Sequence, residues 1–242
     1  MSKEDTGRVL PILFITEMVQ AILAGKSVTR RPIKPRYRAD ESDFIIIQNW
    51  GTGERTVVKV DLEGETFDKP RYVTPPYKPG DILYVRETWS FIPCFECTAD
   101  SCGKIPDYYE DQDMESEGCY IYRAGHAQPE RITWRPSIHM PKAAARIWLK
   151  VTDVWMERLQ DITEEQARAE GAIRCYEEIR PDEDVPVIYE SEDGGGYYTL
   201  GFKAIWNSTI KKSDMEKHGW DANPWVWTIS FVRCEKPREV EE

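Results

Sequence analysis

Ile22-Leu-Ala-Gly-Lys-Ser-Val-Thr-Arg-Arg-Pro32 is the stretch around which we expect the fold of this chain to be organised. The apolar residues that lead into it, Met18, Val19, Ile22 and Leu23, recur with helical spacing after Thr16, a residue type that favours an N-cap. Gly25 follows where such a helix ends, because glycine adopts the left-handed conformation without steric cost. The stretch therefore predicts a short helix that turns into an extended segment.

This predicted corner gathers polar side chains. An ammonium (Lys26), a hydroxyl (Thr29) and two guanidiniums (Arg30 and Arg31) follow the end of the helix. In an extended segment Thr29 and Arg31 point to one face and Arg30 to the other. The residues alone leave two interpretations open, a solvated basic turn or a binding site.

A resemblance bears on this choice. Gly25-Lys26-x-x-Thr29-x-Arg31, with Pro79-Gly80-Asp81 further along, resembles the signature of the ASCH group of PUA-like domains, a glycine followed by Lys-x-x-(Glu/Thr)-x-Arg. In that group one residue usually separates the glycine from the lysine, whereas Gly25 and Lys26 are adjacent here. Three more segments are similar to the long form encoded in phages and prophages: Val85–Trp89, Trp134–Pro141 and Trp220–Trp227.

The resemblance implies an α+β fold, a small PUA-like β-barrel with short helices at its ends and long loop insertions. We expect a single domain over residues 1–242, with insertions at about 33–75, 90–133 and 174–198. Within the last two, residues 91–131 and 175–198 contain little that packs, and we interpret them as loops.

The regular elements are predicted from periodicity and from turn residues. Thr163 and Gln166 form a capping box that predicts a helix from about Glu164 to Glu170, ended by Gly171. Phe202 to Ile210 has helical spacing. Strands are expected at 44–50 and 55–62 (a hairpin), 82–89, 147–152 and 225–231.

Composition limits the class of partner. The chain of 242 residues has a formal net charge of −11, which argues against a broad polyanion-binding surface. Residues 26–38 nevertheless contain six basic side chains and no acid, which suits a locally held anionic or nucleotide substrate. No apolar run reaches transmembrane length and the charged N-terminus is no signal peptide, so we expect a cytoplasmic protein of a bacterial host cell without a membrane partner.

The cysteines leave two alternatives. A disulfide framework is not expected in the cytosol. Cys94-x-x-Cys97-x4-Cys102, followed by Cys119, has the residue types of a structural zinc site, although its spacing is irregular, and unligated thiols are the alternative. No cofactor is required by any other motif.

Three residues are candidates for catalysis. The segment from Ile162 to Gly171 resembles the helix that carries a catalytic glutamate in bacterial N(4)-acetylcytidine amidohydrolases of this superfamily. The resemblance implies Lys26, Thr29 and Glu170 as the catalytic residues. Amide hydrolysis needs a nucleophile, a base and a proton donor, and these three side chains match those roles in the order Thr29, Lys26, Glu170. The alternative is a Lys26–Glu170 salt bridge with Thr29 as an ordinary strand residue.

Further side chains are candidates for substrate binding. Guanidiniums bind phosphate through paired hydrogen bonds, and indole rings stack on bases. Surface ion pairs, core packing and a structural histidine are the alternatives for these groups. The candidates are Arg30, Arg31, Arg86, Glu87, Trp89, Trp134, His139 and Trp225.

The sequence thus favours a protein that recognises a nucleoside or a single-stranded or flipped nucleotide, RNA included, and hydrolyses an amide on a modified base. Phosphodiester cleavage is a less favoured reaction. The first alternative is a binding module for RNA or modified DNA without turnover. The second is a phage accessory protein that engages a host factor through its acidic segments, residues 107–117 and 176–192.

Overall fold

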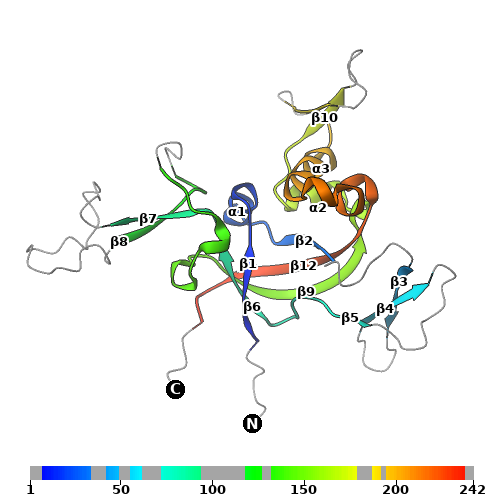
Figure 1. Cartoon of the computed structure of the whole chain (residues 1–242), viewed down its shortest axis with the longest axis horizontal. Helices are drawn as coiled ribbons and strands as arrows, with labels where there is room; N and C mark the ends of the chain where they lie inside the picture. The colour runs from blue at the N-terminus through cyan, green and yellow to red at the C-terminus, as the bar shows by residue number, and fades with distance from the viewer. Residues whose placement is uncertain are drawn as a thin grey trace, which may run out of the picture.

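The computed structural model describes residues 7–33, 42–48, 55–61, 72–93, 118–126, 132–178, 187–191 and 195–237. These residues form one five-stranded sheet, three smaller sheets and several short helices (Figure 1). The α+β class is therefore as expected. None of the described helices has the length and hydropathy needed to cross a membrane.

The five-stranded sheet is the centre of the molecule. Its strand order is β1-β6-β9-β12-β2, in which β1 and β6 are parallel and the other neighbours are antiparallel. Strand β1 was not among the predicted elements. The bounds are β1 Val9–Leu13, β6 Ile82–Arg86, β9 Trp148–Arg158, β12 Trp225–Cys234 and β2 Val28–Pro32.

The two edge strands of this sheet approach each other through side chains. Arg31 of β2 donates a hydrogen bond to the backbone oxygen of Leu13 at the end of β1. Its guanidinium also lies 4.7 Å from the ring centroid of Phe14. Tyr77 donates to the backbone oxygen of Pro11 at 2.9 Å. In the described residues the backbone ladder stops at β1 and β2, and the Arg31 side chain spans the seam between them, whereas Tyr77 belongs to the segment before β6.

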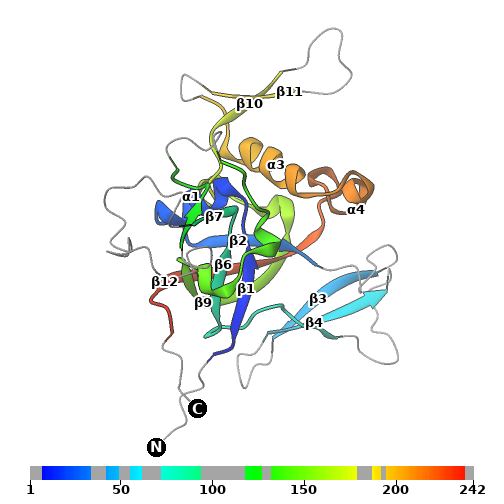
Figure 2. The ribbon, with the colours of Figure 1, turned by 60° about the vertical axis from the view of Figure 1, so that its left-hand side comes forward.

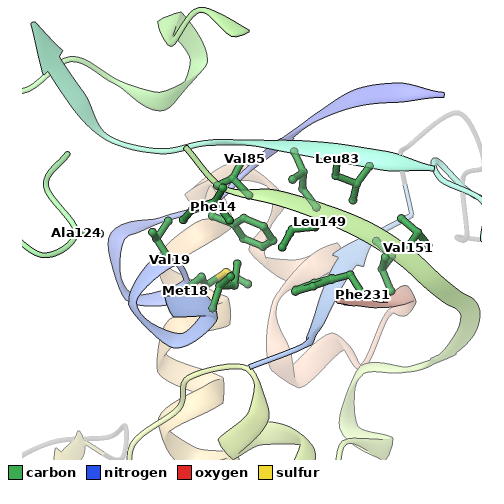
Figure 3. Packing of buried hydrophobic residues seen from close by; sticks show 13 residues of the cluster. Phe14, Met18, Val19, Leu83, Val85, Ala124, Leu149, Val151 and Phe231 are labelled. Atoms are coloured by element: carbon green, nitrogen blue, oxygen red, sulfur yellow. The ribbon is translucent and has the colours of Figure 1, made fainter. Parts of the chain in front are cut away.

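The main core lies between this sheet and helix α1 (Thr16–Leu23). Buried residues of α1, β6, β9 and β12 meet in one layer, as Figure 3 shows for Met18, Val85, Leu149 and Phe231. Thr16 is the first residue of α1, whereas Ile15 is the N-cap and no side chain caps the helix. The expected N-cap role of Thr16 is therefore wrong. Gly25 has a φ of 91°, the conformation predicted for the end of this helix.

A second core cluster forms between the sheet and helices α2 (Glu164–Ala169) and α3 (Tyr198–Thr209). The predicted capping box is present, with both Thr163 and Gln166 in their expected contacts. The short helix α4 (Met215–His218) follows α3. Single 3₁₀ turns complete the helical elements, at Ser137–His139, Lys142–Ala144, Leu159–Asp161, Lys212–Asp214 and Trp220–Ala222.

The three smaller sheets overlap the expected insertions, and they extend away from the central sheet (Figures 1 and 2). The first contains the predicted hairpin, which is confirmed. The expected single strand 82–89 is wrong, because it divides between β6 and β7. The loop interpretation of 91–131 and 175–198 is also wrong where strands β8, β10 and β11 form. The bounds are β3 Ser42–Gln48, β4 Arg55–Asp61, β5 Tyr72–Val73, β7 Trp89–Pro93, β8 Gly118–Tyr122, β10 Cys175–Glu178 and β11 Val187–Glu190.

Asp81, at the turn into β6, has a structural role. Its buried carboxylate accepts hydrogen bonds from the backbone of Arg8 at 3.1 Å and of Lys78 at 2.8 Å, and it forms an ion pair with the Arg8 guanidinium. Burial alone would raise the pKa of Asp81, but the contacts with Arg8 and Lys78 outweigh it and lower this pKa below its ordinary value of 3.8. The carboxylate thus ties the start of β1 to the start of β6.

We expect Asp81→Ala to destabilise the protein by about 1–3 kcal/mol at neutral pH, since the part-buried donors of Arg8 and Lys78 lose a charged acceptor. A carboxyl whose pKa is lower in the folded state contributes its full stabilisation above the unfolded-state pKa and loses it as pH falls through the folded-state pKa. The difference between wild type and variant should therefore shrink from pH 5 towards pH 2. Urea denaturation across this range measures it, and a pH-independent difference would contradict the assignment.

Candidate functional site

Glu170 meets strand β2 although 140 residues separate it from Arg30 in the sequence. The carboxylate is buried at the C-cap of α2, where one oxygen accepts the backbone N–H of Arg30 at 2.9 Å. The other oxygen forms an ion pair with the Arg30 guanidinium. Because β2 is an edge strand, its outward N–H lacks a neighbouring strand, and Glu170 supplies the missing acceptor.

Lys26 belongs to the same corner. Its backbone N–H donates to the oxygen of Ala21 at 2.9 Å, just after α1. Gly171 has a φ of +91°, and a Cβ built there would lie 2.6 Å from the Cβ of Ala21. Only glycine allows the end of α2 to approach α1 this closely. The end of α1, the start of β2 and the end of α2 therefore converge, and we call this region the β2 corner.

Arg30 is the structural centre of the β2 corner. Its side chain is fully buried and forms ion pairs with both Glu157 and Glu170. It also donates to the side-chain oxygen of Gln166 at 3.0 Å. Thr228 donates in turn to Glu157 at 2.8 Å. The expectation of Arg30 as a surface ion pair is wrong, and its guanidinium is already engaged by protein acceptors rather than open to a substrate.

The alternative of a Lys26–Glu170 salt bridge is also not what the structure shows. Arg30 takes the place of Lys26 as the partner of Glu170. Lys26 is a half-buried residue, and within the ranges that the structure describes its ammonium has no hydrogen bond or ion pair.

Thr29 has an unusual environment for a hydroxyl. It is 1 % exposed and pairs with Ile229 of β12, on the opposite face of β2 from Arg30. Its Oγ1 has no hydrogen-bond partner among the described residues. Buried polar atoms nearly always have one, so each exception needs an explanation.

Burial shifts the pKa values of two charged side chains at the β2 corner, Glu170 and Arg31. Burial raises the pKa of Glu170, and Arg30 and Arg31 counteract this only in part. Burial likewise lowers the pKa of Arg31 from its ordinary value, against the opposing influence of Tyr77 and Glu170. The carboxyl of Glu170 is therefore protonated more readily than an ordinary glutamate.

The other predicted binding residues form a second group. Glu87 is buried, and Arg146 binds its two oxygens at 2.9 Å each. Burial raises the pKa of Glu87 although Arg146 opposes this. Sequence reasoning missed Arg146. Nothing in the local pattern marks it, because its partner lies 59 positions away.

The three tryptophans predicted to bind substrate lie in different surroundings. Trp89 is buried with Met140 and Ala144, and its Nε1 has no acceptor among the described residues. Trp134 contacts the ring of His126 edge-on, with centroids 5.7 Å apart. The ring centroid of Trp225 lies 4.5 Å from the guanidinium of Arg158, and its side chain packs against a third buried cluster, formed by Ile33, Met156 and Trp227.

Arg86 connects the two groups. It donates to the backbone oxygen of Ile138 in the exposed turn that also carries His139, while its own backbone oxygen accepts the N–H of Phe14 at 3.1 Å. Its Nε is buried without an acceptor in the described part of the chain.

The predicted zinc site lies largely outside the described residues. Cys94, Cys97 and Cys102 lie outside the described residues, and Cys119 lies in β8. Across the described ranges no three His, Cys, Asp or Glu side chains gather in a way that would hold a metal ion. The acidic segment 107–117 also lies outside these ranges.

Comparison of the chain with protein-family models, with curated proteins and with solved structures gave no match. The assignment of a function therefore depends on the residues and on their geometry.

Proposed function

We propose that the β2 corner binds a nucleoside and hydrolyses an amide on its base. The observation that carries this proposal is the Thr29 hydroxyl, which is buried and unpartnered in the described structure. Leaving such a group unmatched costs about 1–3 kcal/mol, a cost that a catalytic nucleophile justifies. The Glu170 carboxyl, whose pKa is raised by burial, accepts the backbone N–H of Arg30, the residue after Thr29, and adds a second reactive group.

The reaction assigns one role to each side chain. Thr29 Oγ1 attacks the acyl carbon while the Lys26 amine takes the hydroxyl proton. The C–N bond then breaks, and the protonated Glu170 gives its proton to the leaving amine of the base. Water hydrolyses the resulting Thr29 ester and restores all three groups, releasing the free carboxylic acid.

The proposal extends to the fold. We infer that the five-stranded sheet is a PUA-like barrel whose seam between β1 and β2 is spanned by Arg31 instead of a backbone ladder. The contacts of Arg31 with Leu13 and with the ring of Phe14 support this inference. The seam lies beside the β2 corner, because Arg31 follows Thr29 and Arg30 on the same strand.

The test is release of cytidine from N(4)-acetylcytidine, followed by chromatography. We expect turnover by the wild type and a loss of about 10²–10⁴-fold in Lys26→Met, which keeps the length of the side chain and removes the base. Lys150→Met, an exposed substitution on β9, is the matched control and should retain full activity. A fully active Lys26→Met variant would contradict the proposal.

Binding without turnover is the second candidate function. The observation in its favour is the Arg30–Glu170 ion pair, because a guanidinium stabilises the carboxylate rather than the acid. Saturable nucleoside binding by a wild type that releases no product would support this candidate over hydrolysis.

A further inference from the structure

A second concentration of positive charge lies outside the β2 corner. Residues 118–146 contain five lysines and arginines and a single acid, Glu130, in a chain whose net charge is −11. The basic residues are Arg123, Arg131, Arg135, Lys142 and Arg146. The described part of this segment comprises β8 and the loop that leads to β9. Such a local concentration of positive charge on an acidic protein indicates an anionic partner.

The backbone of this segment is held in place by the β7–β8 sheet. Trp89 and Arg135 exchange two backbone hydrogen bonds, at 3.2 and 2.7 Å. Tyr122 donates to the backbone oxygen of Ala144. On the other side, the Arg123 N–H donates to the oxygen of Thr88 at 3.0 Å. Arg123 and Arg135 therefore flank the start of β7 from both sides.

The basic side chains of this segment differ in whether protein groups already bind them. Arg146 is committed to Glu87 and to the backbone oxygen of Ala124. Arg123 and Arg135 are exposed, and in the described residues neither forms an ion pair with a carboxylate. The Arg135 guanidinium lies 5.2 Å from the ring centroid of Trp89, which fixes its direction without neutralising it.

Exposed apolar and aromatic groups accompany these cations. Ile138 is 57 % exposed and Tyr120 is 37 % exposed, while His139 is exposed in the same turn as Ile138. We call the exposed side chains of Tyr120, Arg123, Arg135, Ile138 and His139 the 118–146 surface. Guanidiniums interleaved with a π-face and apolar groups are the combination that binds single-stranded nucleic acid, since cations contact phosphates and rings stack on bases.

We propose that the 118–146 surface binds the phosphate backbone of a single-stranded polynucleotide. A continuous line of contacts leads from it to the β2 corner, from Ile138 to Arg86, from Arg86 to Phe14, and from the adjacent Leu13 to Arg31. We extend the proposal to a base of the bound strand that enters the corner, so that the substrate is a polymer rather than a free nucleoside. This last step rests on the proposed function, whereas binding at the 118–146 surface does not.

The experiment measures fluorescence anisotropy of labelled oligo-uridine and oligo-thymidine of about twelve nucleotides, within the site sizes typical of such surfaces. The double variant Arg123→Glu/Arg135→Glu should bind at least about tenfold more weakly than wild type. The slope of log affinity against log salt should fall by about 0.7 for each phosphate that the variant no longer neutralises. The single variant Arg123→Glu, whose side chain forms no hydrogen bond or ion pair in the described structure, should show a smaller loss in the same direction.

Lys211→Glu/Lys212→Glu is the matched control. It makes the same change in net charge at two exposed residues beyond α3 and should alter affinity by less than about twofold. Equal losses in both double variants would overturn the proposal, because they would reflect net charge alone. Absence of oligonucleotide binding by the wild type at low salt would overturn it as well, as would a duplex that binds as tightly as the single strand.

Turnover separates this inference from the proposed function. Arg123→Glu/Arg135→Glu should still hydrolyse the free nucleoside at the wild-type rate, because neither residue lies in the β2 corner. Oligonucleotide binding by a wild type that hydrolyses no nucleoside would support the binding surface and overturn the hydrolase. Hydrolysis of the nucleoside by a wild type that binds no oligonucleotide would support the hydrolase and overturn the binding surface.

Discussion

Arg30→Met should destabilise the protein by about 3–5 kcal/mol, the largest effect that we expect from any single substitution at the β2 corner. The guanidinium is fully buried and lies between the carboxylates of Glu157 and Glu170, whose side chains are 16 % and 1 % exposed. Methionine fills a similar volume but leaves two negative charges without a counter-ion in a dry environment. Urea denaturation followed by tryptophan fluorescence measures the loss. The slope of the unfolding free energy against urea concentration should be the same as in wild type if unfolding remains two-state.

Two companion variants identify the cause of this loss. Arg233→Met removes an exposed arginine from β12 and should change stability by less than about 0.5 kcal/mol. Arg30→Met combined with Glu157→Gln and Glu170→Gln should recover much of the stability, because no buried charge then remains unpaired. This triple variant also keeps the test valid if Arg30→Met alone does not fold. A triple variant no more stable than Arg30→Met would show that packing, and not charge, explains the loss.

Thr29→Val should abolish hydrolysis while leaving the protein as stable as wild type or more stable by about 1 kcal/mol. Valine has the shape of threonine and the same preference for strands, and it removes a buried hydroxyl that no described residue satisfies. Without Oγ1 no acyl ester can form, so product release should fall below detection. Product chromatography measures the activity and thermal denaturation measures the stability.

Thr29→Ser provides the matching control, since it restores a hydroxyl at the same position and should retain measurable turnover. Opposite effects on activity and stability in Thr29→Val are what distinguish a catalytic hydroxyl from a structural one. If Thr29→Val were destabilised by more than about 1 kcal/mol, the hydroxyl would have a structural partner. The nucleophile assignment would then be wrong.

Several predictions that depended on neighbouring residues agree with the structure, although the N-cap role of Thr16 does not. The capping box of Thr163 and Gln166, the positive φ of Gly25 and the β3–β4 hairpin each involve residues a few positions apart. Such features are fixed by backbone sterics and by local hydrogen bonds, which a short stretch of sequence contains in full.

Strand β1 shows what a local rule leaves undecided. Val9-Leu-Pro-Ile-Leu13 has an apolar pattern interrupted by Pro11, which argues against a central strand. In the structure β1 lies at the edge of the sheet, where a residue without an N–H is tolerated. Whether a strand is central or at an edge depends on which strands pair with it, and that information is not local.

What the sequence determined by itself is part of the set of short elements, among them helix α2 and the β3–β4 hairpin, together with the concentration of Lys26, Thr29, Arg30 and Arg31 directly after Gly25. Only the tertiary structure decided that Arg30, and not Lys26, pairs with Glu170, that Arg146 pairs with Glu87, and that Arg31 spans the seam between β1 and β2. A charge selects its partner by distance and burial in the folded chain, and residues far apart in sequence acquire both only when the sheet curves and α2 docks against α1.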